Sequence, residues 1–257
     1  MNVLSVNNLT KAFGGLKAVS GVNMQIDKGE LIGLIGPNGA GKTTIFNLLT
    51  GVYEPSEGEV VFTGKNTKGF PPYKVTQLGM ARTFQNIRLF GEMTVLENVM
   101  VAYHNHAPHG IVSSIFRLPS FYKGEAEMQE QAVEFLKIFK LDHKVSELAK
   151  NLPYGEQRRL EIARALASKP QLLLLDEPAA GMNPNETKEL MEMIRWIRDN
   201  FQLTILLIEH DMSLVMNVCE RIYVLDYGQI IAHGNPEEIR NNPKVIEAYL
   251  GEEVAHA

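Results

Sequence analysis

Residues Gly36–Thr43 read GPNGAGKT, and glycines, a lysine and a hydroxyl at this spacing can bind a nucleoside triphosphate. In such a loop, backbone N–H groups surround the phosphates where a helix begins with its positive dipole end. We expect Lys42 to reach the β- and γ-phosphates and Thr43 to offer its hydroxyl to Mg²⁺. A plain glycine turn is the alternative, but Glu30–Ile35 predicts a buried strand before the loop and Thr44–Leu49 a helix after it. The candidate nucleotide-binding residues here are Gly36, Pro37, Asn38, Gly39, Ala40, Gly41, Lys42, Thr43 and Thr44.

Two acids follow an apolar run further along the chain. Leu172–Leu175 predicts a fully buried strand, and Asp176 and Glu177 come at its carboxyl end. Ligands of open α/β sheets bind at that edge. We expect Asp176 to hold Mg²⁺, directly or through water, and Glu177 to orient and polarise the attacking water. The alternative is that the two acids only end a strand before Pro178.

His210 stands in the sequence LLIEHDM, at the end of the neighbouring apolar strand Thr204–Ile208. A lone histidine after a strand is more often structural than catalytic. Beside the other motifs, its imidazole is expected to bond the γ-phosphate and to hold Glu177 and the water in line.

The remaining elements must position these residues. Leu4–Leu9, Val22–Ile26, Glu30–Ile35 and Glu59–Phe62 predict strands between turn-rich segments, which together suit an antiparallel layer beside the phosphate site. Further on, helices and strands alternate, which predicts a parallel sheet with crossover helices on both faces. The helices expected in this part and in an inserted helical lobe are Glu125–Phe139, Glu156–Ala167, Glu186–Asp199 and Met212–Val218.

Composition narrows the class of protein. The 257 residues are 45% hydrophobic and carry a net charge of −5, so no general attraction for nucleic acid or anionic lipid is expected. Cys219 is the only cysteine, which excludes an internal disulfide framework and fits a reducing compartment. The N-terminal residues lack the pattern of a signal peptide, and no apolar run approaches the roughly 20 residues that span a bilayer.

These motifs together resemble the ABC-type ATPases, the nucleotide-binding subunits of ABC transporters. GPNGAGKT is similar to their Walker A motif and LLLLDEP to their Walker B motif. The resemblance implies that Gln85, in ARTFQNIRLF, is the Q-loop glutamine that touches Mg²⁺ and the attacking water. It also implies that Phe13, in KAFGG, stacks on adenine, although a surface aromatic in a turn is the alternative. The segment AAGMN resembles the D-loop, with Asn183 where the family usually has aspartate.

The segment LPYGEQRRLEIARAL, Leu152–Leu166, resembles the family signature LSGGQ and the helix after it. In the family this helix N-terminus meets the γ-phosphate bound to the opposite subunit, so that two chains enclose two ATP molecules. Tyr154, Gly155 and Glu156 are the candidate contacts. Pro153 stands where serine is usual, which removes one side-chain donor and leaves the contact to backbone N–H groups.

The resemblance implies an α/β fold with a RecA-like P-loop NTPase core of parallel strands, an N-terminal antiparallel β-subdomain and an inserted helical subdomain. The whole of 1–257 is expected to form one ATPase domain, with the insertion at about 88–168 and a C-terminal helical tail at about 236–257. The implied cofactors are ATP and Mg²⁺. The implied partners are membrane permease subunits, a periplasmic solute-binding protein indirectly, and a second ATPase chain in a homodimer or heterodimer, with no nucleic acid.

Within the family, RLFGEMTVLENV, DEPAAGMNP, IEHDM and VIEAYLGEE are most similar to the ATP-binding subunits of bacterial branched-chain amino acid importers. This implies a peripheral protein at the cytoplasmic face of the inner membrane. A urea or lipopolysaccharide transporter subunit, and a soluble ABC ATPase without transport function, remain as alternatives. The stretch Ala102–Lys123 includes His104, His106 and His109. Their spacing could form a metal site, but no acid or cysteine lies close, and a partner-docking surface is favoured.

Overall fold

A computed structural model describes residues 1–103 and 119–255 of the chain. The chain divides into two compact units, which are described separately. The first unit contains Met1–Arg82, Gln171–Ala180 and Met191–Ala257, and the second contains Thr83–Pro170 and Gly181–Leu190. The stretch with His104, His106 and His109, for which a metal site was considered, lies outside the described residues.

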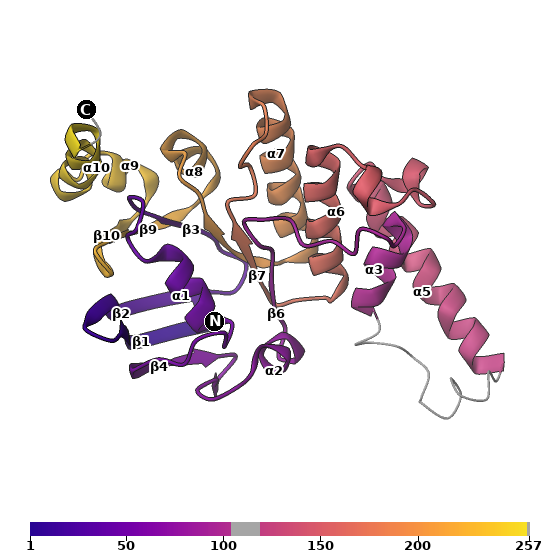
Figure 1. Cartoon of the computed structure of the whole chain (residues 1–257), viewed down its shortest axis with the longest axis horizontal. Coiled ribbons are helices and arrows are strands. Elements are labelled where there is room, and N and C mark those ends of the chain that lie inside the picture. The colour runs from indigo at the N-terminus through magenta and orange to yellow at the C-terminus, as the bar shows by residue number, and fades with distance from the viewer. Residues whose placement is uncertain (104–118, 256–257) are drawn as a thin grey trace. The chain divides into compact units, whose positions relative to one another are not determined.

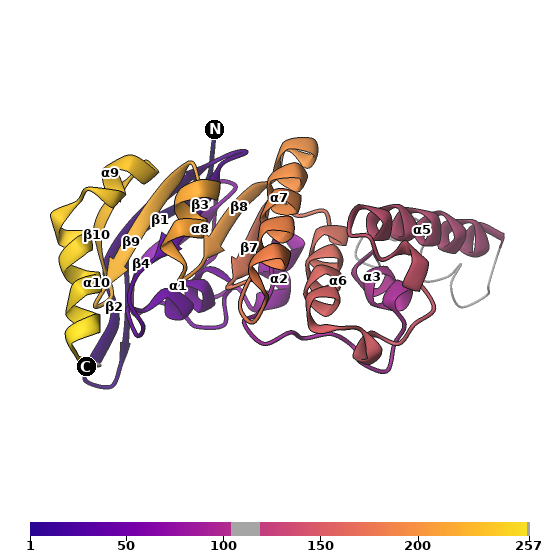
Figure 2. The same cartoon turned by 90° about the horizontal axis from the view of Figure 1, so that it is seen from above.

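A six-stranded sheet forms the centre of the first unit, in the order β10-β9-β3-β8-β7-β6 (Figure 1, Figure 2). Its strands are parallel except for β10, which pairs antiparallel with β9. The middle strands β3, β7 and β8 are buried along their whole length, as expected for a parallel sheet covered on both faces. The prediction of parallel strands is confirmed. The strands are β3 (Leu31–Ile35), β6 (Met80–Arg82), β7 (Leu172–Asp176), β8 (Thr204–Ile208), β9 (Arg221–Asp226) and β10 (Gln229–Gly234).

A four-stranded antiparallel sheet in the order β2-β1-β4-β5 completes the strands of this unit. The predicted antiparallel layer is therefore confirmed for three of its strands and wrong for Glu30–Ile35. That segment is β3, which pairs in parallel with β8 and β9 because all five of its side chains are apolar or glycine and need cover on both faces. The strands of this second sheet are β1 (Asn2–Phe13), β2 (Leu16–Asp27), β4 (Glu57–Phe62) and β5 (Lys65–Asn66).

Strands β6, β9 and β10 were not predicted. Strand β6 has only three residues, too few to show a period. Strands β9 and β10 form a hairpin whose two-residue turn, Tyr227 and Gly228, has φ values of 40° and 76°. Positive φ at both positions is the geometry of the commonest tight hairpin turn, and the Tyr-Gly pair between two apolar runs was its signal.

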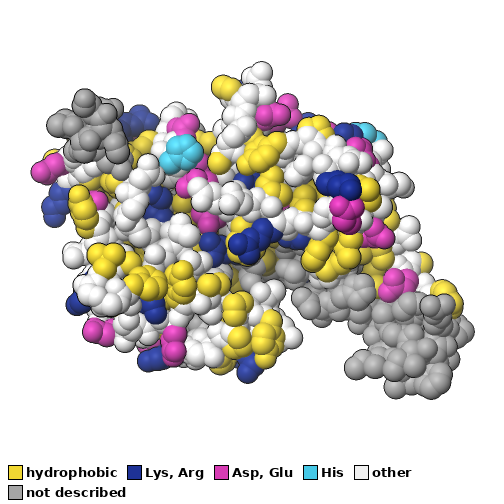
Figure 3. Space-filling view, viewed as in Figure 1, with side chains coloured by type: hydrophobic (Ala, Val, Ile, Leu, Met, Phe, Trp, Pro, Cys, Tyr) yellow, Lys and Arg dark blue, Asp and Glu magenta, His cyan; other side chains and the backbone are white. Residues whose placement is uncertain are grey.

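The helices of the first unit cover the sheets. One core of buried side chains joins helix α1 to strands of both sheets, including Phe46 of α1, Leu9 of β1 and Leu174 of β7. The predicted helices Thr44–Leu49 and Met212–Val218 are confirmed. Acidic and basic side chains are interspersed over the face shown in Figure 3. The helices are α1 (Lys42–Leu49), α2 (Pro72–Gln77), α8 (Met212–Val218), α9 (Pro236–Arg240), α10 (Pro243–Ala255) and the later part of α7 (Pro184–Phe201).

The second unit is helical. Helices α3 (Val95–Tyr103), α5 (Pro119–Ile138) and α6 (Tyr154–Ala167) pack against one another, as Figure 2 shows, and the first turns of α7 belong to the same unit. Two short 3₁₀ turns, Asp142–Lys144 and Ala149–Asn151, connect α5 to α6. Within residues 1–103 and 119–255, every helix is too short or too polar to cross a membrane.

Candidate nucleotide site

The glycine-rich loop links the central strand β3 to α1. Two of its glycines hold backbone positions that other residues cannot take. Gly36 has φ 153°, and a Cβ there would lie 2.0 Å from the Leu225 carbonyl oxygen. Gly41 has φ 106°, and its Cβ would lie 2.6 Å from the carbonyl oxygen of Ala18. The loop therefore needs glycine at both positions to pass close to its neighbouring strands.

Lys42 begins α1 and folds back over the loop. Its Nζ donates to the carbonyl oxygens of Gly36 at 2.5 Å and Pro37 at 2.9 Å, and the residue is buried. The N-cap residue of α1 is Gly41, which has no side chain to cap the helix, and the first turn of α1 contains no acid. A helix end with uncapped N–H groups and a lysine favours an anion, so the loop fits the phosphates of a nucleotide.

The register of the sheet brings the predicted polar residues to the edge where the loop begins. Asp176, the last residue of β7, pairs with Ile208 of β8, and Ile208 pairs with Leu34 of β3. Glu177 and His210 follow the ends of β7 and β8, and the phosphate loop follows the end of β3. All these residues belong to the first unit.

Asp176 forms a buried ion pair that the sequence analysis missed. Its Oδ2 accepts from Arg82 Nη2 at 2.8 Å, and the two side chains are 3% and 8% exposed. Arg82 also donates to Asn47 Oδ1 at 2.6 Å and lies over the ring of Phe46. The orientation of the Asp176 carboxylate is thereby fixed. No signal in the sequence indicated this pair, because Arg82 ends β6, a strand too short to show a period.

Glu177 has a strained backbone. Its φ is 46°, in the left-handed region, which costs a residue other than glycine about 1–2 kcal/mol. Its N–H donates to the carbonyl oxygen of Ile208 at 2.9 Å, and its own carbonyl oxygen accepts from Ala180 N–H at 3.1 Å. Backbone strain of this kind is found where structure is held for function, and here it falls on the predicted catalytic carboxylate.

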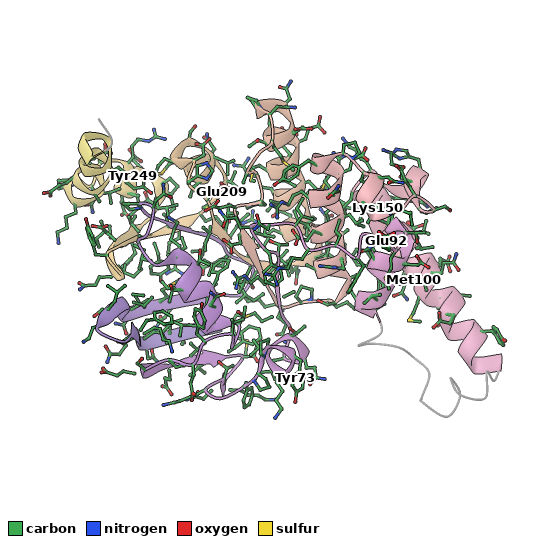
Figure 4. The ribbon with its side chains drawn as sticks, in the orientation of Figure 1. Tyr73, Glu92, Met100, Lys150, Glu209 and Tyr249 are labelled. Atoms are coloured by element: carbon green, nitrogen blue, oxygen red, sulfur yellow. The ribbon has the colours of Figure 1, made fainter. Side chains whose placement is uncertain are left out.

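Glu209 is a third carboxylate at this edge of the sheet, and the sequence analysis did not identify it (Figure 4). Its side chain is 1% exposed, and burial raises its pKa, an effect that the hydrogen bond from Ala179 N–H and the nearby His210 oppose. Ala179 N lies 2.9 Å from Glu209 Oε1, and His210 Nδ1 lies 3.7 Å from Oε2. Glu209 thus connects the segment after β7 to the exposed His210. The sequence offered a weak signal, an acid directly before the predicted histidine.

Phe13 ends β1 as a partly exposed ring, 43% accessible. Tyr53 packs edge-on against it, with ring centroids 5.3 Å apart. Lys11 Nζ lies 5.2 Å from the centroid of Phe13 and 5.8 Å from that of Tyr53. Phe13 therefore belongs to an aromatic and cationic group rather than standing alone in a turn, and Tyr53 and Lys11 were missed because neither lies in a recognisable motif.

The second unit contains the other predicted residues. Gln85 is exposed in a segment without helix or strand, and Tyr154 and Gly155 open α6. Glu156 pairs with Lys144 at 2.6 Å, which gives its carboxylate a structural partner. Asn183 Oδ1 accepts from the N–H groups of Asn185 and Glu186, both at 3.0 Å, so that it caps α7.

The first unit thus combines a P-loop at a helix N-terminus, two acids at the end of the buried strand β7 of the same sheet, and an antiparallel sheet with an exposed aromatic. The fold and this arrangement define a P-loop nucleoside triphosphatase. The family model described as "ABC transporter" matches residues 19–180, and one described as "Branched-chain amino acid ATP-binding cassette transporter" matches residues 229–255. The chain belongs to the ATP-binding proteins of ABC transporters and is an ATPase of that family.

Known proteins are similar to this chain over almost its whole length. The chain is 50% identical over 250 residues to the high-affinity branched-chain amino acid transport ATP-binding protein LivG of Escherichia coli K12, covering 97% of this chain and 98% of that protein. A crystal structure of an ABC-transporter ATP-binding cassette in its ADP conformation matches with a TM-score of 0.84 and 35% identity, over 98% of this chain and 99% of that one. A dimeric cassette in a post-hydrolysis state, bound to ADP and Pi, matches with a TM-score of 0.76 and 25% identity, over 91% and 98%. The expected fold class is confirmed.

Proposed function

We propose that this chain hydrolyses ATP to drive the import of branched-chain amino acids through membrane permease subunits. The observation that carries the substrate class is the 50% identity to the LivG protein across 97% of the chain. The match of residues 229–255 to a branched-chain amino acid cassette model supports the same branch, because it covers β10, α9 and α10, beyond the parts that bind nucleotide.

In this proposal the P-loop binds the triphosphate with its backbone N–H groups and Lys42. Phe13 stacks on adenine, with Tyr53 supporting its ring. Glu177 accepts a proton from the attacking water, and His210 orients the water and the γ-phosphate. These roles are supported by the shared edge of β3, β8 and β7 and by the group at the end of β1.

The residues at the edge of the sheet also fit a magnesium ion. Mg²⁺ prefers oxygen ligands, and the hydroxyl of Thr43 at the first turn of α1 and the carboxylate of Asp176 supply them. Gln85, which belongs to the second unit, is proposed as a further ligand on the family resemblance alone. When bound, the ion neutralises charge that develops on the phosphates. Arg82 keeps the Asp176 carboxylate in one orientation for that role.

We further propose that two ATPase chains enclose the nucleotides, with Tyr154, Gly155 and Glu156 of one chain facing the γ-phosphate held by the other and Asn183 at the contact between chains. The dimeric cassette with ADP and Pi supports this arrangement. The partner chain is a second copy or a related ATPase. The assembly acts at the cytoplasmic face of the inner membrane with its permeases and, indirectly, a periplasmic solute-binding protein.

Deletion of the gene in its host tests the proposal. Uptake of labelled leucine by the deletion strain should fall and should return with the wild-type gene, but not with Lys42→Ala. Arg159→Lys, a conservative change at a partly exposed side chain of α6, is the matched control and should restore uptake. Unchanged leucine uptake with lost urea uptake would instead indicate a urea transporter. Loss of neither solute, with the chain recovered free of permeases, would overturn the transport proposal.

A further inference from the structure

The segment that carries Gln85 depends on side chains of α6 for its backbone hydrogen bonds. Residues 83–90 contain neither helix nor strand. Arg158 Nη1 donates to the Phe84 carbonyl oxygen at 2.6 Å, and Arg158 Nη2 donates to that of Gln85 at 2.7 Å. One guanidinium therefore holds two successive carbonyl groups, and one of them belongs to the Q-loop glutamine itself. All these atoms lie in the second unit.

Two more charged residues of α6 extend the same contact. Glu161 Oε1 accepts from the Arg88 N–H at 3.1 Å, and Arg164 donates through Nη2 to the Arg88 carbonyl oxygen. Positions 158, 161 and 164 are three residues apart and share one face of the helix. The loop is thus held at both ends of the stretch Phe84–Arg88.

Arg158 and Glu161 are buried at unusual cost. They pair at 2.8 Å with side chains that are 0% and 1% exposed. Burial raises the pKa of Glu161, while the Arg88 N–H, Arg158 and Arg164 oppose that shift. In general, a buried ion pair adds little net stability over apolar residues, because desolvation offsets much of the attraction between the charges. The charged pair can hydrogen-bond to the loop carbonyl groups and fix their geometry, which an apolar pair cannot do.

The Arg158 guanidinium also contacts the start of α6, where Tyr154 and Gly155 form the tip of the signature segment. Arg158 Nη2 lies 3.3 Å from the hydroxyl oxygen of Tyr154, and its Cζ lies 6.0 Å from the centroid of the Tyr154 ring. Tyr154 is the first residue of α6 and one of the two tip residues, beside Gly155. Arg158 therefore contacts both the Gln85 segment and the tip. These contacts join parts that are distant in the chain, since Arg158 and Gln85 are 73 positions apart.

We propose that Arg158, supported by Glu161, is a positioning residue that joins the Gln85 loop and the Tyr154–Gly155 tip into one body. This inference rests on the proposed sandwich dimer. There, Gln85 serves the nucleotide of its own chain and the tip serves the nucleotide of the partner. A rigid connection between them makes occupation of one nucleotide site favour closure at the other, which is a coupling between the two sites.

The test uses Glu177→Gln as a background in which the ATP-bound dimer accumulates. In that background we compare Arg158→Lys with the matched control Arg159→Lys, one position along the same helix, where the side chain is 21% exposed. Lysine keeps the positive charge beside Glu161 but lacks the planar fork that serves two carbonyl groups at once. The ATP concentration for half-maximal dimer, measured by analytical ultracentrifugation, should rise about ten-fold or more in Arg158→Lys and stay unchanged in Arg159→Lys.

Two further readouts separate positioning from general loosening. The affinity of the dilute monomer for ATP, measured by calorimetry, should stay within about two-fold, because the phosphate loop is in the other unit. In chains that retain Glu177, the Hill coefficient for ATP hydrolysis should fall towards one in Arg158→Lys. If Arg158→Lys melts too early to assay, the double variant Arg158→Met with Glu161→Leu leaves neither charge unpaired and should show the same two effects.

The outcomes distinguish this inference from the function on which it rests. Dimer formation at the background ATP concentration in Arg158→Lys, with an unchanged Hill coefficient, would overturn the coupling and leave the ATPase assignment intact. A Glu177→Gln chain that binds ATP but never dimerises with any ATPase chain of the assembly would overturn the sandwich, and this inference with it.

Discussion

The ion pair between Arg82 and Asp176 gives a sharp prediction, because the chain contains an exposed pair of almost the same length. Arg82 and Asp176 lie 2.8 Å apart with side chains 8% and 3% exposed. Lys150 and Glu92 lie 2.7 Å apart with side chains 49% and 81% exposed, as Figure 4 shows them side by side. The two ion pairs therefore have matched N···O distances but differ in burial.

Arg82→Met keeps an unbranched side chain but removes the hydrogen bonds to Asp176 and Asn47 and the guanidinium that lies over Phe46. Removing one partner of a buried pair leaves a buried charge and costs about 3–5 kcal/mol. At about 2–4 °C per kcal/mol for a domain of this size, the melting temperature should fall by about 6–20 °C. Lys150→Met breaks an exposed pair worth about 0–1 kcal/mol, so that its fall should stay under about 4 °C.

Differential scanning calorimetry of the two variants without nucleotide measures this contrast. A double variant, Arg82→Met with Asp176→Leu, should regain a large part of the lost melting temperature because no unpaired charge remains. Equal melting temperatures for Arg82→Met and Lys150→Met would refute the reasoning, since burial would then not determine the strength of the pair. A double variant less stable than Arg82→Met would show that Asp176 stabilises the fold by another route.

Three further predictions concern the same edge of the sheet. Lys42→Ala should weaken ATP binding by about 100-fold or more in calorimetry, because two charge-assisted contacts to phosphate are lost; unchanged affinity would contradict the phosphate-loop assignment. Glu177→Gln should bind ATP normally, lower turnover by about 100-fold or more, and elute as an ATP-dependent dimer; normal hydrolysis would remove Glu177 from its role. Glu209→Gln should flatten the dependence of stability on pH. Burial raises the pKa of Glu209. Between pH 4.5, where the unfolded chain releases this proton, and the raised pKa of the folded state, only the folded state holds the proton, and the free energy of unfolding therefore falls as the pH rises. Glutamine can still accept from Ala179 N–H, and denaturant midpoints at about pH 5 and pH 7 should therefore differ less than in the wild type; an equal difference would contradict this.

The sequence allowed the phosphate loop, the acids after β7 and the histidine after β8 to be predicted, because each depends on local pattern and on the order of parallel strands. Strand β3 was assigned to the wrong sheet for a related reason. Its apolar run shows burial on both faces but not which partners bury it, and Glu30–Ile35 follows closely after two strands that do pair antiparallel. Pairing depends on residues distant in the chain, here those of β8 and β9.

The charged network of α6 could not be predicted from its sequence. The helix QRRLEIARAL shows two adjacent arginines, and nothing local tells which one is buried. In the structure Arg158 is fully buried and Arg159 is partly exposed, because only the first faces the carbonyl groups of residues 84 and 85. The contact joins residues more than 70 positions apart, and its partners are backbone atoms, which leave no trace in residue types.

Three unfavourable features of this protein lie at the edge of the sheet where the function is proposed. Glu177 has a left-handed backbone, Glu209 is a carboxylate with a raised pKa in the interior, and Asp176 requires an arginine inside the fold. Each lowers stability or demands compensation, and a fold selected for stability alone has no use for all three at one edge of a sheet. The strain at Glu177 is held by the bond from its N–H to Ile208 of β8, the same strand whose end leads to Glu209 and His210. Contacts with the neighbouring strand therefore compensate for the strained backbone of the proposed catalytic carboxylate. This arrangement is expected when the geometry required at the γ-phosphate, and not stability, determines the conformation of Glu177.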